Sequence, residues 1–226
     1  MSRRLVLFDC DGTLVDSQHV IHEAMSFAFL DHGLSPLPRQ DVRRVIGLPL
    51  DTAIAQLHPV GSSDQVAGLA RSYKEAFVQL RQRVGHHEPL FDGMREVIET
   101  LDDQGALLGI VTGKGSQGLA MVLAQHDLTA RFVTLQTADT APGKPDPGMV
   151  NQAIAETGAL AADTVVVGDT TFDMAMAVAA GVPAIGVAWG YHPSDHLIAA
   201  GARCIVDHPT DLHGVIDDLM ASAATV

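Results

Sequence analysis

The sequence is poor in cysteine, in positive charge and in long apolar runs, and each shortage excludes a class of protein. Only two of the 226 residues are cysteines, Cys10 and Cys204, which cannot form a disulfide framework. The 14 basic residues against 27 acidic ones give a net charge of −13, which argues against nucleic-acid binding through phosphate contacts. No segment approaches the ~20 apolar residues of a membrane helix, and the short apolar run after Arg4 is not typical of a secretion signal. We therefore expect a cytoplasmic protein that binds neither nucleic acid nor a membrane.

What the sequence does contain is typical of a globular protein with a sizeable core. Hydrophobic residues make up 47% of the chain and charged residues 18%, a composition too apolar for intrinsic disorder. Beyond about residue 89, short apolar runs alternate with helix-like stretches. This alternation predicts an α/β fold whose parallel sheet is covered on both faces. The expected strands are 5–8, 107–111, 165–167, 184–187 and 204–206, with a weaker one at 132–135.

Residues 15–88 show no strand pattern and several helical ones, which indicates a helical insertion into the α/β core. One helix is expected from about residue 17 to 32, ending at Gly33. A second follows Ser62 and carries apolar residues at three- and four-residue spacing, which favours a packed face over a cofactor site. That stripe consists of Val66, Leu69, Ala70, Tyr73, Phe77, Leu80 and Val84. We therefore expect two units, a core of residues 1–14 plus 89–226 and a helical unit of residues 15–88.

Two carboxylates, Asp9 and Asp11, follow the first predicted strand. At the carboxyl edge of a parallel sheet both can project into a crevice, where open α/β sheets bind ligands. Adjacent negative charges resist joint ionisation, and a divalent cation relieves their repulsion. Because the ligands are oxygens without clustered cysteine or histidine, the pattern favours Mg²⁺ over zinc. Gly12 lets the backbone approach an anion closely, and the alternative interpretation is a plain acidic turn.

Three later signals lie at or near the ends of predicted strands and weaken that alternative. Thr112-Gly113 brings a hydroxyl and a flexible backbone, both suited to phosphate oxygens. Lys144, one of only three lysines in the chain, is held between a glycine and a proline. Asp169 ends a further strand, and Asp173 follows one helical turn later. Together these signals favour a ligand site at this edge of the sheet.

The chain resembles the haloacid dehalogenase superfamily of phosphohydrolases over nearly its whole length. The four motifs of that superfamily match, in order, Asp9-x-Asp11-Gly12-Thr13, Thr112-Gly113, Lys144, and Gly168-Asp169 with Asp173. The resemblance implies a three-layer α/β core with an inserted helical cap that closes over the site and selects substrates. Segments 47–50 and 186–190 are most similar to the phosphoglycolate phosphatase branch.

The resemblance also implies a mechanism. Asp9 would attack phosphorus and form an aspartyl-phosphate, while Asp11 would protonate the leaving alkoxide and later deprotonate the attacking water. Mg²⁺ would be held by the Asp9 carboxylate, the Asp11 backbone carbonyl and Asp169. Asp173 would support the metal shell or position Lys144 rather than bind the metal directly.

Phosphate binding and substrate selection follow from the same resemblance. The residues expected to bind the phosphoryl group are Gly12, Thr112, Gly113 and Lys144. The residues expected to select the substrate are Arg44, Gly47 and Leu50 in the cap. We expect a small phosphorylated metabolite, with phosphoglycolate first, while sugar phosphates, nucleoside monophosphates and pyrophosphate stay open. The protein is expected to be a monomer or a homodimer.

Three other activities remain as alternatives. Sugar phosphomutase relatives carry an acid/base histidine in the first cap helix, at the position of Ile21 here, which disfavours a mutase. Phosphonate hydrolases use a cap lysine for a Schiff base, and the only cap lysine, Lys74, lies on the helix interpreted as structural. A receiver-like phospho-switch combines aspartates, Mg²⁺, Thr and Lys, but the Asp11 acid, which supports turnover, and the large helical insertion disfavour it.

Overall fold

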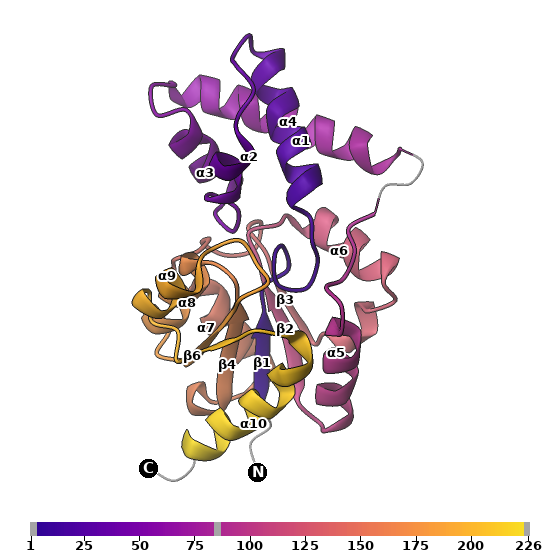
Figure 1. Ribbon diagram of the computed structural model, residues 1–226, viewed down its shortest axis with the longest axis vertical. Helices are drawn as coiled ribbons and strands as arrows, with labels where there is room; N and C mark the ends of the chain where they lie inside the picture. Colours follow the sequence, from indigo (N-terminus) through magenta and orange to yellow (C-terminus); the bar gives the residue numbers. More distant parts are fainter. Residues whose placement is uncertain (1–3, 84–86, 224–226) are drawn as a thin grey trace.

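The computed structural model, which describes residues 4–83 and 87–223, places six parallel strands in one sheet (Figure 1). The strands are β1 (Leu5–Phe8), β2 (Leu107–Val111), β3 (Thr134–Gln136), β4 (Thr164–Gly168), β5 (Ala184–Val187) and β6 (Cys204–Val206). Their order in the sheet is β3-β2-β1-β4-β5-β6. The predicted α/β fold with a parallel sheet is therefore confirmed, and β1 lies in the middle of the sheet.

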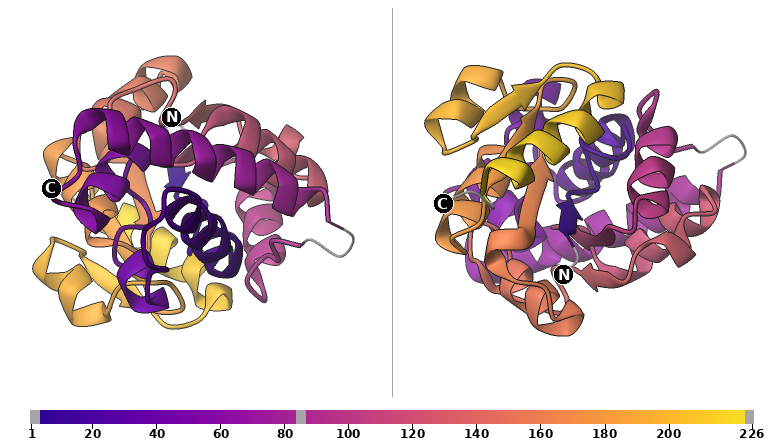
Figure 2. Two further views of the ribbon diagram at one scale, coloured as in Figure 1. Left: turned by 90° about the horizontal axis from the view of Figure 1, so that it is seen from above. Right: turned by 90° about the horizontal axis from the view of Figure 1, so that it is seen from below.

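Helices cover both faces of the sheet because the side chains of each strand alternate between them. In β1, Val6 and Phe8 join one hydrophobic cluster, while Leu5 and Leu7 join the other. The first cluster is covered by α5 (Met94–Asp103), α6 (Ser116–Gln125) and α10 (Leu212–Ala223). The second is covered by α7 (Gly148–Thr157), α8 (Thr171–Ala179) and α9 (Ser194–Ala199). The core thus has three layers, helix, sheet and helix (Figure 2).

Four further helices lie beyond the carboxyl edge of the sheet, at the top of Figure 1. They are α1 (Gln18–Asp31), α2 (Arg39–Arg43), α3 (Leu50–Leu57) and α4 (Ser63–Arg81). α4 begins with a capping box, in which the Ser62 hydroxyl accepts the Gln65 N–H and the Gln65 side chain accepts the Ser62 N–H. The four helices bury apolar faces mainly against one another, above all α1 against α4.

The observed elements differ from the expected ones mainly at their ends. The weak strand expected at 132–135 lies at Thr134–Gln136, because only these residues are in register with β2, while Phe132 packs edge-on against Phe8. β4 is one residue longer at each end than expected, since Thr164 pairs with Leu5 and Gly168 with Gly186. No helix in the described ranges, 4–83 and 87–223, is long and apolar enough to cross a bilayer.

The predicted apolar stripe of α4 is packed only in part. Leu69, Ala70 and Leu80 are buried, as a packed face requires. Tyr73 and Phe77 touch the same clusters but remain partly exposed on the side facing the sheet. Val84 lies outside the described residues. The stripe therefore combines a packed face with an aromatic surface that borders a cavity.

Candidate active site

The predicted site residues converge because the strands that carry them are parallel and end at one edge. Asp9 follows β1, Thr112 follows β2 and Asp169 follows β4. β1 pairs with both β2 and β4, so these three strand ends are neighbours. These side chains are close in space although they are far apart in the sequence, because the parallel pairing of the strands brings their carboxyl ends together.

Asp9 is fully buried, and its two carboxylate oxygens have different surroundings. Oδ1 accepts the Cys10 N–H at 2.7 Å and lies 2.7 Å from the Lys144 ammonium. Oδ2 has no hydrogen-bond partner among the described residues. Burial raises the pKa of Asp9 to about 7, although Lys144 opposes this rise. One buried carboxylate oxygen is therefore left available for a ligand or a reacting atom.

Lys144 is held between two carboxylates. Its ammonium is 2.7 Å from Asp9 and 2.6 Å from Asp173, and it is fully buried. Burial opposes the positive charge, but Asp173 and Asp9 outweigh it and raise the pKa of Lys144. The other oxygen of Asp173 accepts the Thr170 N–H and hydroxyl, which begins α8 with a capping box. Asp173 thus anchors both a helix start and the ammonium beside Asp9.

Asp169 is fixed from both sides. Its Oδ1 accepts the Thr13 hydroxyl at 2.8 Å, and its Oδ2 accepts the Tyr191 N–H at 2.8 Å. Gly12 has a φ of 91°, and a Cβ at this position would overlap the Asp169 carboxylate. A glycine is therefore required there for backbone conformation and for space. Burial raises the pKa of Asp169 well above its usual value, and Asp9 and Asp173 add to the rise.

These carboxylates form a cluster that fits a divalent cation. Oxygens of Asp9, Asp169 and Asp173 lie within 4.8 Å of one another, and all three residues are buried. Their combined negative charge is costly in a dry site, as the raised pKa values of Asp9 and Asp169 show. An all-oxygen set with an unpartnered Asp9 oxygen suits a hard cation such as Mg²⁺. Asp9, with its unpartnered oxygen, is the best direct ligand of the three. Both oxygens of Asp169 accept hydrogen bonds, whereas Asp173 is bound by the Lys144 ammonium and by Thr170.

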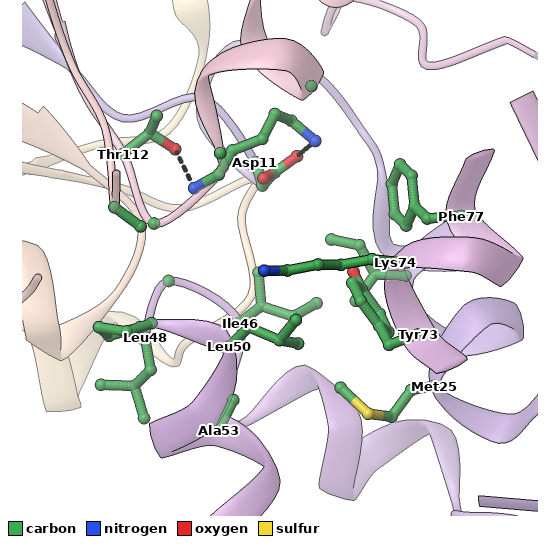
Figure 3. A pocket seen from close by; sticks show the side chains of 18 of the residues that line it. Asp11, Met25, Ile46, Leu48, Leu50, Ala53, Tyr73, Lys74, Phe77 and Thr112 are labelled. Carbon is green, nitrogen blue, oxygen red and sulfur yellow. Dashed lines mark hydrogen bonds and ion pairs between the residues drawn. The ribbon is translucent and has the colours of Figure 1, made fainter. Parts of the chain in front are cut away.

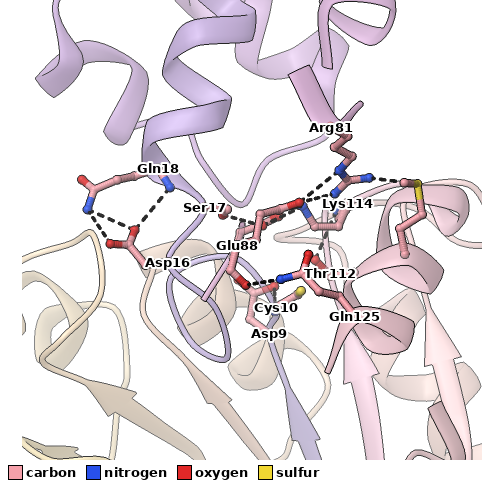
Figure 4. Close-up of polar contacts among 12 residues, drawn as sticks. Asp9, Cys10, Asp16, Ser17, Gln18, Arg81, Glu88, Thr112, Lys114 and Gln125 are labelled. Carbon is pink, nitrogen blue, oxygen red and sulfur yellow. Dashed lines mark hydrogen bonds and ion pairs between the residues drawn. The ribbon is translucent and has the colours of Figure 1, made fainter. Parts of the chain in front are cut away.

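The side chain of Asp11 belongs to a second network, which the sequence did not predict. Figure 4 shows Ser17, Lys114, Glu88 and Arg81, which are members of this network. Its Oδ1 accepts the Ser17 hydroxyl at 2.6 Å and lies 2.8 Å from the Lys114 ammonium. Lys114 also contacts Glu88 at 3.1 Å, and Glu88 pairs with Arg81 at 2.6 Å. A chain of charges therefore runs from the end of α4 to Asp11.

The charges in this network stabilise one another. Burial opposes the ionisation of Glu88, but Lys114 and Arg81 outweigh it and lower the pKa of Glu88. Burial also opposes the charge on Lys114, yet Asp11 and Glu88 raise its pKa. The only signal in the sequence was the scarcity of lysine, and no spacing pattern connects positions 11, 81, 88 and 114.

A cavity of about 600 Å³ separates the sheet edge from helices α1–α4 (Figure 3). The sequence-predicted residues that line it are Asp9, Asp11, Gly47, Leu50, Thr112 and Gly113. Gly12, Lys144, Asp169 and Asp173 lie behind this lining. Arg44 is not part of the wall, since its side chain is 73% exposed and faces Asp41 at 3.6 Å. Only the 47–50 part of the predicted selection loop therefore faces the cavity.

The loop at 47–50 contacts the sheet-edge loops directly. A Cβ on Gly113 would lie 2.7 Å from the Gly47 carbonyl oxygen, and one on Gly143 would overlap the Pro49 ring. Two glycines on the core side thus allow the close approach of the helical unit. This contact closes one side of the cavity.

Lys74 is not on a purely structural face, contrary to the interpretation of its helix from sequence. It lines the cavity, and its side chain extends from α4 into the middle of it (Figure 3). The error has a simple source. Helix periodicity identifies the apolar stripe, but it does not show that a second element faces the neighbouring residues across open space.

Comparison with known proteins finds matches over almost the whole chain. The family model for haloacid dehalogenase-like hydrolases matches residues 6–187. A protein of Dickeya dadantii named "Probable phosphatase IndB" is 37% identical over 96% of this chain and 94% of its own. A phosphoglycolate phosphatase of Xylella fastidiosa is 30% identical over 91% of this chain and 90% of its own. An N-acetylmuramic acid 6-phosphate phosphatase of Pseudomonas putida is 30% identical over 97% of this chain and 99% of its own.

Solved structures show the same architecture. The crystal structure of a hydrolase from Pseudomonas syringae superposes with a TM-score of 0.84 and 26% identity, covering 96% of this chain and 99% of that chain. The "crystal structure of a predicted phosphatase from Clostridium acetobutylicum" gives a TM-score of 0.86 at 22% identity and covers 96% of this chain and 100% of that chain. At that identity it supports the fold alone.

Proposed function

The chain belongs to the haloacid dehalogenase-like hydrolases and is a phosphatase of this family, and we propose that it hydrolyses the phosphate monoester of a small metabolite through an aspartyl-phosphate on Asp9. One observation carries the proposal. The buried Asp9 carboxylate is fixed by Lys144 and the Cys10 N–H through one oxygen, while the other is unpartnered where a cavity begins. A fixed carboxylate with a free oxygen suits a nucleophile.

In the first step, an Asp9 oxygen forms a bond to phosphorus as the bond from phosphorus to the ester oxygen breaks. The leaving alkoxide takes a proton from the Asp11 carboxyl. Asp11 is suited to this task because it lines the cavity two residues from Asp9 and is oriented by Ser17 and Lys114.

In the second step, water attacks the phosphorus of the aspartyl-phosphate. Asp11, now a carboxylate, takes the proton of that water, so the residue returns to its starting protonation state. The bond between phosphorus and the Asp9 oxygen breaks, which releases phosphate and regenerates the carboxylate. Lys144 stays beside Asp9 throughout and offsets negative charge there.

We propose that the residues which hold the phosphoryl oxygens are Gly12, Thr112, Gly113 and Lys144. Mg²⁺ would be held by the Asp9 and Asp169 carboxylates and the Asp11 backbone carbonyl, and when bound it neutralises the phosphoryl oxygens and keeps Asp9 ionised. The raised pKa values of Asp9 and Asp169 support this assignment, because both carboxylates need a nearby positive charge to be ionised.

We further propose that residues 15–88 act as a cap over a core of residues 1–14 plus 89–226. The cavity between helices α1–α4 and the sheet edge supports this division, because a substrate bound at Asp9 would be enclosed by both units. Exclusion of bulk water from such a space strengthens the electrostatic interactions around the phosphoryl group. The two cysteines are free thiols, which supports a reducing, cytoplasmic location.

The relatives suggest two substrate classes. Phosphoglycolate is one, since several relatives near 30% identity are phosphoglycolate phosphatases. A phosphorylated sugar acid is the other, from the N-acetylmuramic acid 6-phosphate phosphatase of similar identity. A cavity of about 600 Å³ is far larger than a glycolate group, which favours the second class.

A sugar phosphomutase is the less favoured alternative. Ile21, at the position where mutase relatives carry an acid/base histidine, lines the cavity with an apolar side chain. The neighbouring His22 hydrogen-bonds the Leu37 carbonyl at 2.9 Å, and neither His19 nor His22 lines the cavity. No described histidine is therefore available at the place where a second acid/base group would act.

The test is phosphate release by purified protein from a generic aryl phosphate and a phosphometabolite panel, with Mg²⁺ or with EDTA. Asp9→Asn and Asp11→Asn should abolish turnover, whereas Asp102→Asn, on an exposed ion pair away from the cavity, should leave it unchanged. Turnover that survives Asp9→Asn would overturn the proposed nucleophile. Stable labelling of Asp9 by a phosphodonor without turnover would support the phospho-switch instead.

A further inference from the structure

The cavity is lined by three basic side chains, and two of them are already neutralised. Lys114 is paired with Asp11 and Glu88, and Arg81 is paired with Glu88. Lys74 is exposed and lies on the same wall, with no hydrogen bond or salt bridge in the described parts of the chain. Its side chain extends into the cavity between Thr112 and Asp11 on one side and Ile46 and Leu48 on the other (Figure 3). Lys74 is therefore the cation that is available to a ligand.

The acidic residues on the outer wall are accommodated by their own neighbours. Asp139 accepts the Ser116 N–H at 2.6 Å. Asp51 lies in the first turn of α3, where the helix N-terminus favours a negative charge. Neither residue is paired with Lys74 in the described parts of the chain. The Lys74 ammonium is therefore free to pair with an anionic group of a ligand.

The wall around Lys74 is apolar and partly aromatic. Tyr73 and Phe77 are in contact on α4, with ring centroids 5.5 Å apart, and both border the cavity. The Phe77 ring is held by Arg81 and Lys114, whose charged groups lie 4.5 and 5.3 Å from its centroid. Met25, from α1, adds to the same wall (Figure 3). Such a fixed surface suits a ring or another bulky apolar group.

We propose that the substrate is a phosphate monoester whose alcohol part carries both a carboxylate, bound by Lys74, and an apolar section that packs on Tyr73, Phe77 and Met25. This inference rests on the proposed phosphatase function, which places the phosphoryl group at Asp9. The cavity reaches from Asp9 and Asp11 past Lys74 to these side chains, so one molecule can contact all three regions. Lys74 is then a specificity-determining residue and takes no part in bond breaking.

The first measurement is binding, which does not depend on turnover. Phosphonates carry phosphorus on carbon and so lack the ester that the enzyme would hydrolyse. Three are compared by calorimetry on the wild-type protein with Mg²⁺: para-(phosphonomethyl)benzoate, its neutral primary amide, and the small phosphonopropanoate. The benzoate should bind roughly fivefold more tightly than the amide, the effect of one partly solvated charge pair. It should also bind more tightly than phosphonopropanoate, which cannot reach the aromatic wall.

Three variants assign the preference to Lys74. Lys74→Met should make the benzoate and the amide bind equally, whereas Lys74→Arg should keep the preference because a guanidinium also binds a carboxylate. Arg71→Met is the matched control, since Arg71 is an exposed cation on the same helix that does not line the cavity. This control should keep the wild-type preference. Retention in Lys74→Arg also separates anion binding from a Schiff-base role, which an arginine cannot perform.

The inference is overturned if wild-type protein binds the benzoate and the amide equally, if Lys74→Met keeps the preference, or if none of the three phosphonates binds. Equal binding of phosphonopropanoate and the benzoate would overturn the proposed packing of an apolar section on Tyr73, Phe77 and Met25. Phosphate release from a plain aryl phosphate tests the proposed function separately. Hydrolysis without a Lys74-dependent preference would contradict only the substrate class, and the preference without hydrolysis would contradict only the phosphatase activity.

Discussion

Lys144 is the residue on which the charge balance of the site depends most. Its ammonium lies between Asp9 and Asp173, and all three side chains are inaccessible to water. The desolvation cost of each charge is offset only by the other charges, so removing one leaves the rest uncompensated. The same arrangement suits the proposed nucleophile, because it fixes one oxygen of Asp9 and leaves the other without a hydrogen-bond partner in the described residues.

Lys144→Met should abolish turnover and lower the free energy of unfolding by about 3 kcal/mol, because Asp9 and Asp173 would lose their buried cation. Urea unfolding and phosphate-release assays measure the two effects. Lys74→Met is the matched control, since Lys74 is exposed and its loss should change stability by less than about 0.5 kcal/mol. Equal stability losses in the two variants would contradict the buried charge balance.

At the scale of elements, the contacts between the α1–α4 region and the sheet edge include a loop contact and an ion-pair chain. The loop at 47–50 rests on Gly113 and Gly143, where any side chain would intrude. The ion-pair chain joins Arg81 at the end of α4 to Glu88 and Lys114. Both contacts border the cavity, so both should affect how it closes.

Gly143→Ala should lower kcat/KM by roughly tenfold, because its Cβ would overlap the Pro49 ring and push the 47–50 loop away from the site. The companion variant Gly143→Ala with Pro49→Ala removes the overlapping ring atoms and should recover most of the loss. Steady-state kinetics on an aryl phosphate measure both. A failure of the double variant to recover would indicate that the Gly143 backbone, rather than the loop contact, is what matters.

Glu88→Gln should destabilise the protein by about 3 kcal/mol, because Arg81 and Lys114 would keep their buried charges without the anion between them. Glu23→Gln is the matched control, since the Glu23–Arg83 pair is more than half exposed and exposed pairs contribute less than about 1 kcal/mol. Chemical denaturation distinguishes the two. Similar effects in both variants would argue that burial adds nothing to this ion pair.

At the scale of the whole molecule, stability should depend on the proposed metal binding. Folding buries several carboxylates at one sheet edge, which opposes folding whenever they are ionised. The raised pKa of Asp9, about 7, means that the metal-free folded state holds this proton more tightly than the unfolded chain does. Stability from the protonated form is present below the ordinary pKa of an aspartate and is lost as pH rises through about 7.

Mg²⁺ should therefore raise the melting temperature more at pH 7.5 than at pH 5, since protons compete with the cation for Asp9 at low pH. Thermal melts with Mg²⁺ and with EDTA at the two pH values measure the difference. Asp9→Asn should reduce both the Mg²⁺ effect and its pH dependence. An equal rise at both pH values would contradict the assignment of Asp9 as a ligand.

The sequence by itself determined the fold class and the sheet edge at which the candidate site residues meet. Apolar runs of strand length alternating with helices fix a parallel sheet, and parallel strands end at one edge whatever their distance in the chain. The residues after β1, β2 and β4 therefore had to be neighbours, which is why the sequence could place Asp9, Thr112 and Asp169 at one edge of the sheet. The match to the haloacid dehalogenase-like hydrolases confirms the resemblance inferred from these motifs.

Only the tertiary structure decided which side chains from the helical unit face the site. Helix periodicity reports which residues are apolar, but not which element lies opposite them. It could not show that Lys74 enters the cavity, that Arg44 points away from it, or that Lys114 joins Asp11 to Glu88. These contacts depend on how helices α1–α4 lie against the sheet edge. That arrangement includes close contacts between distant segments, such as Gly113 against Gly47, which no local pattern encodes.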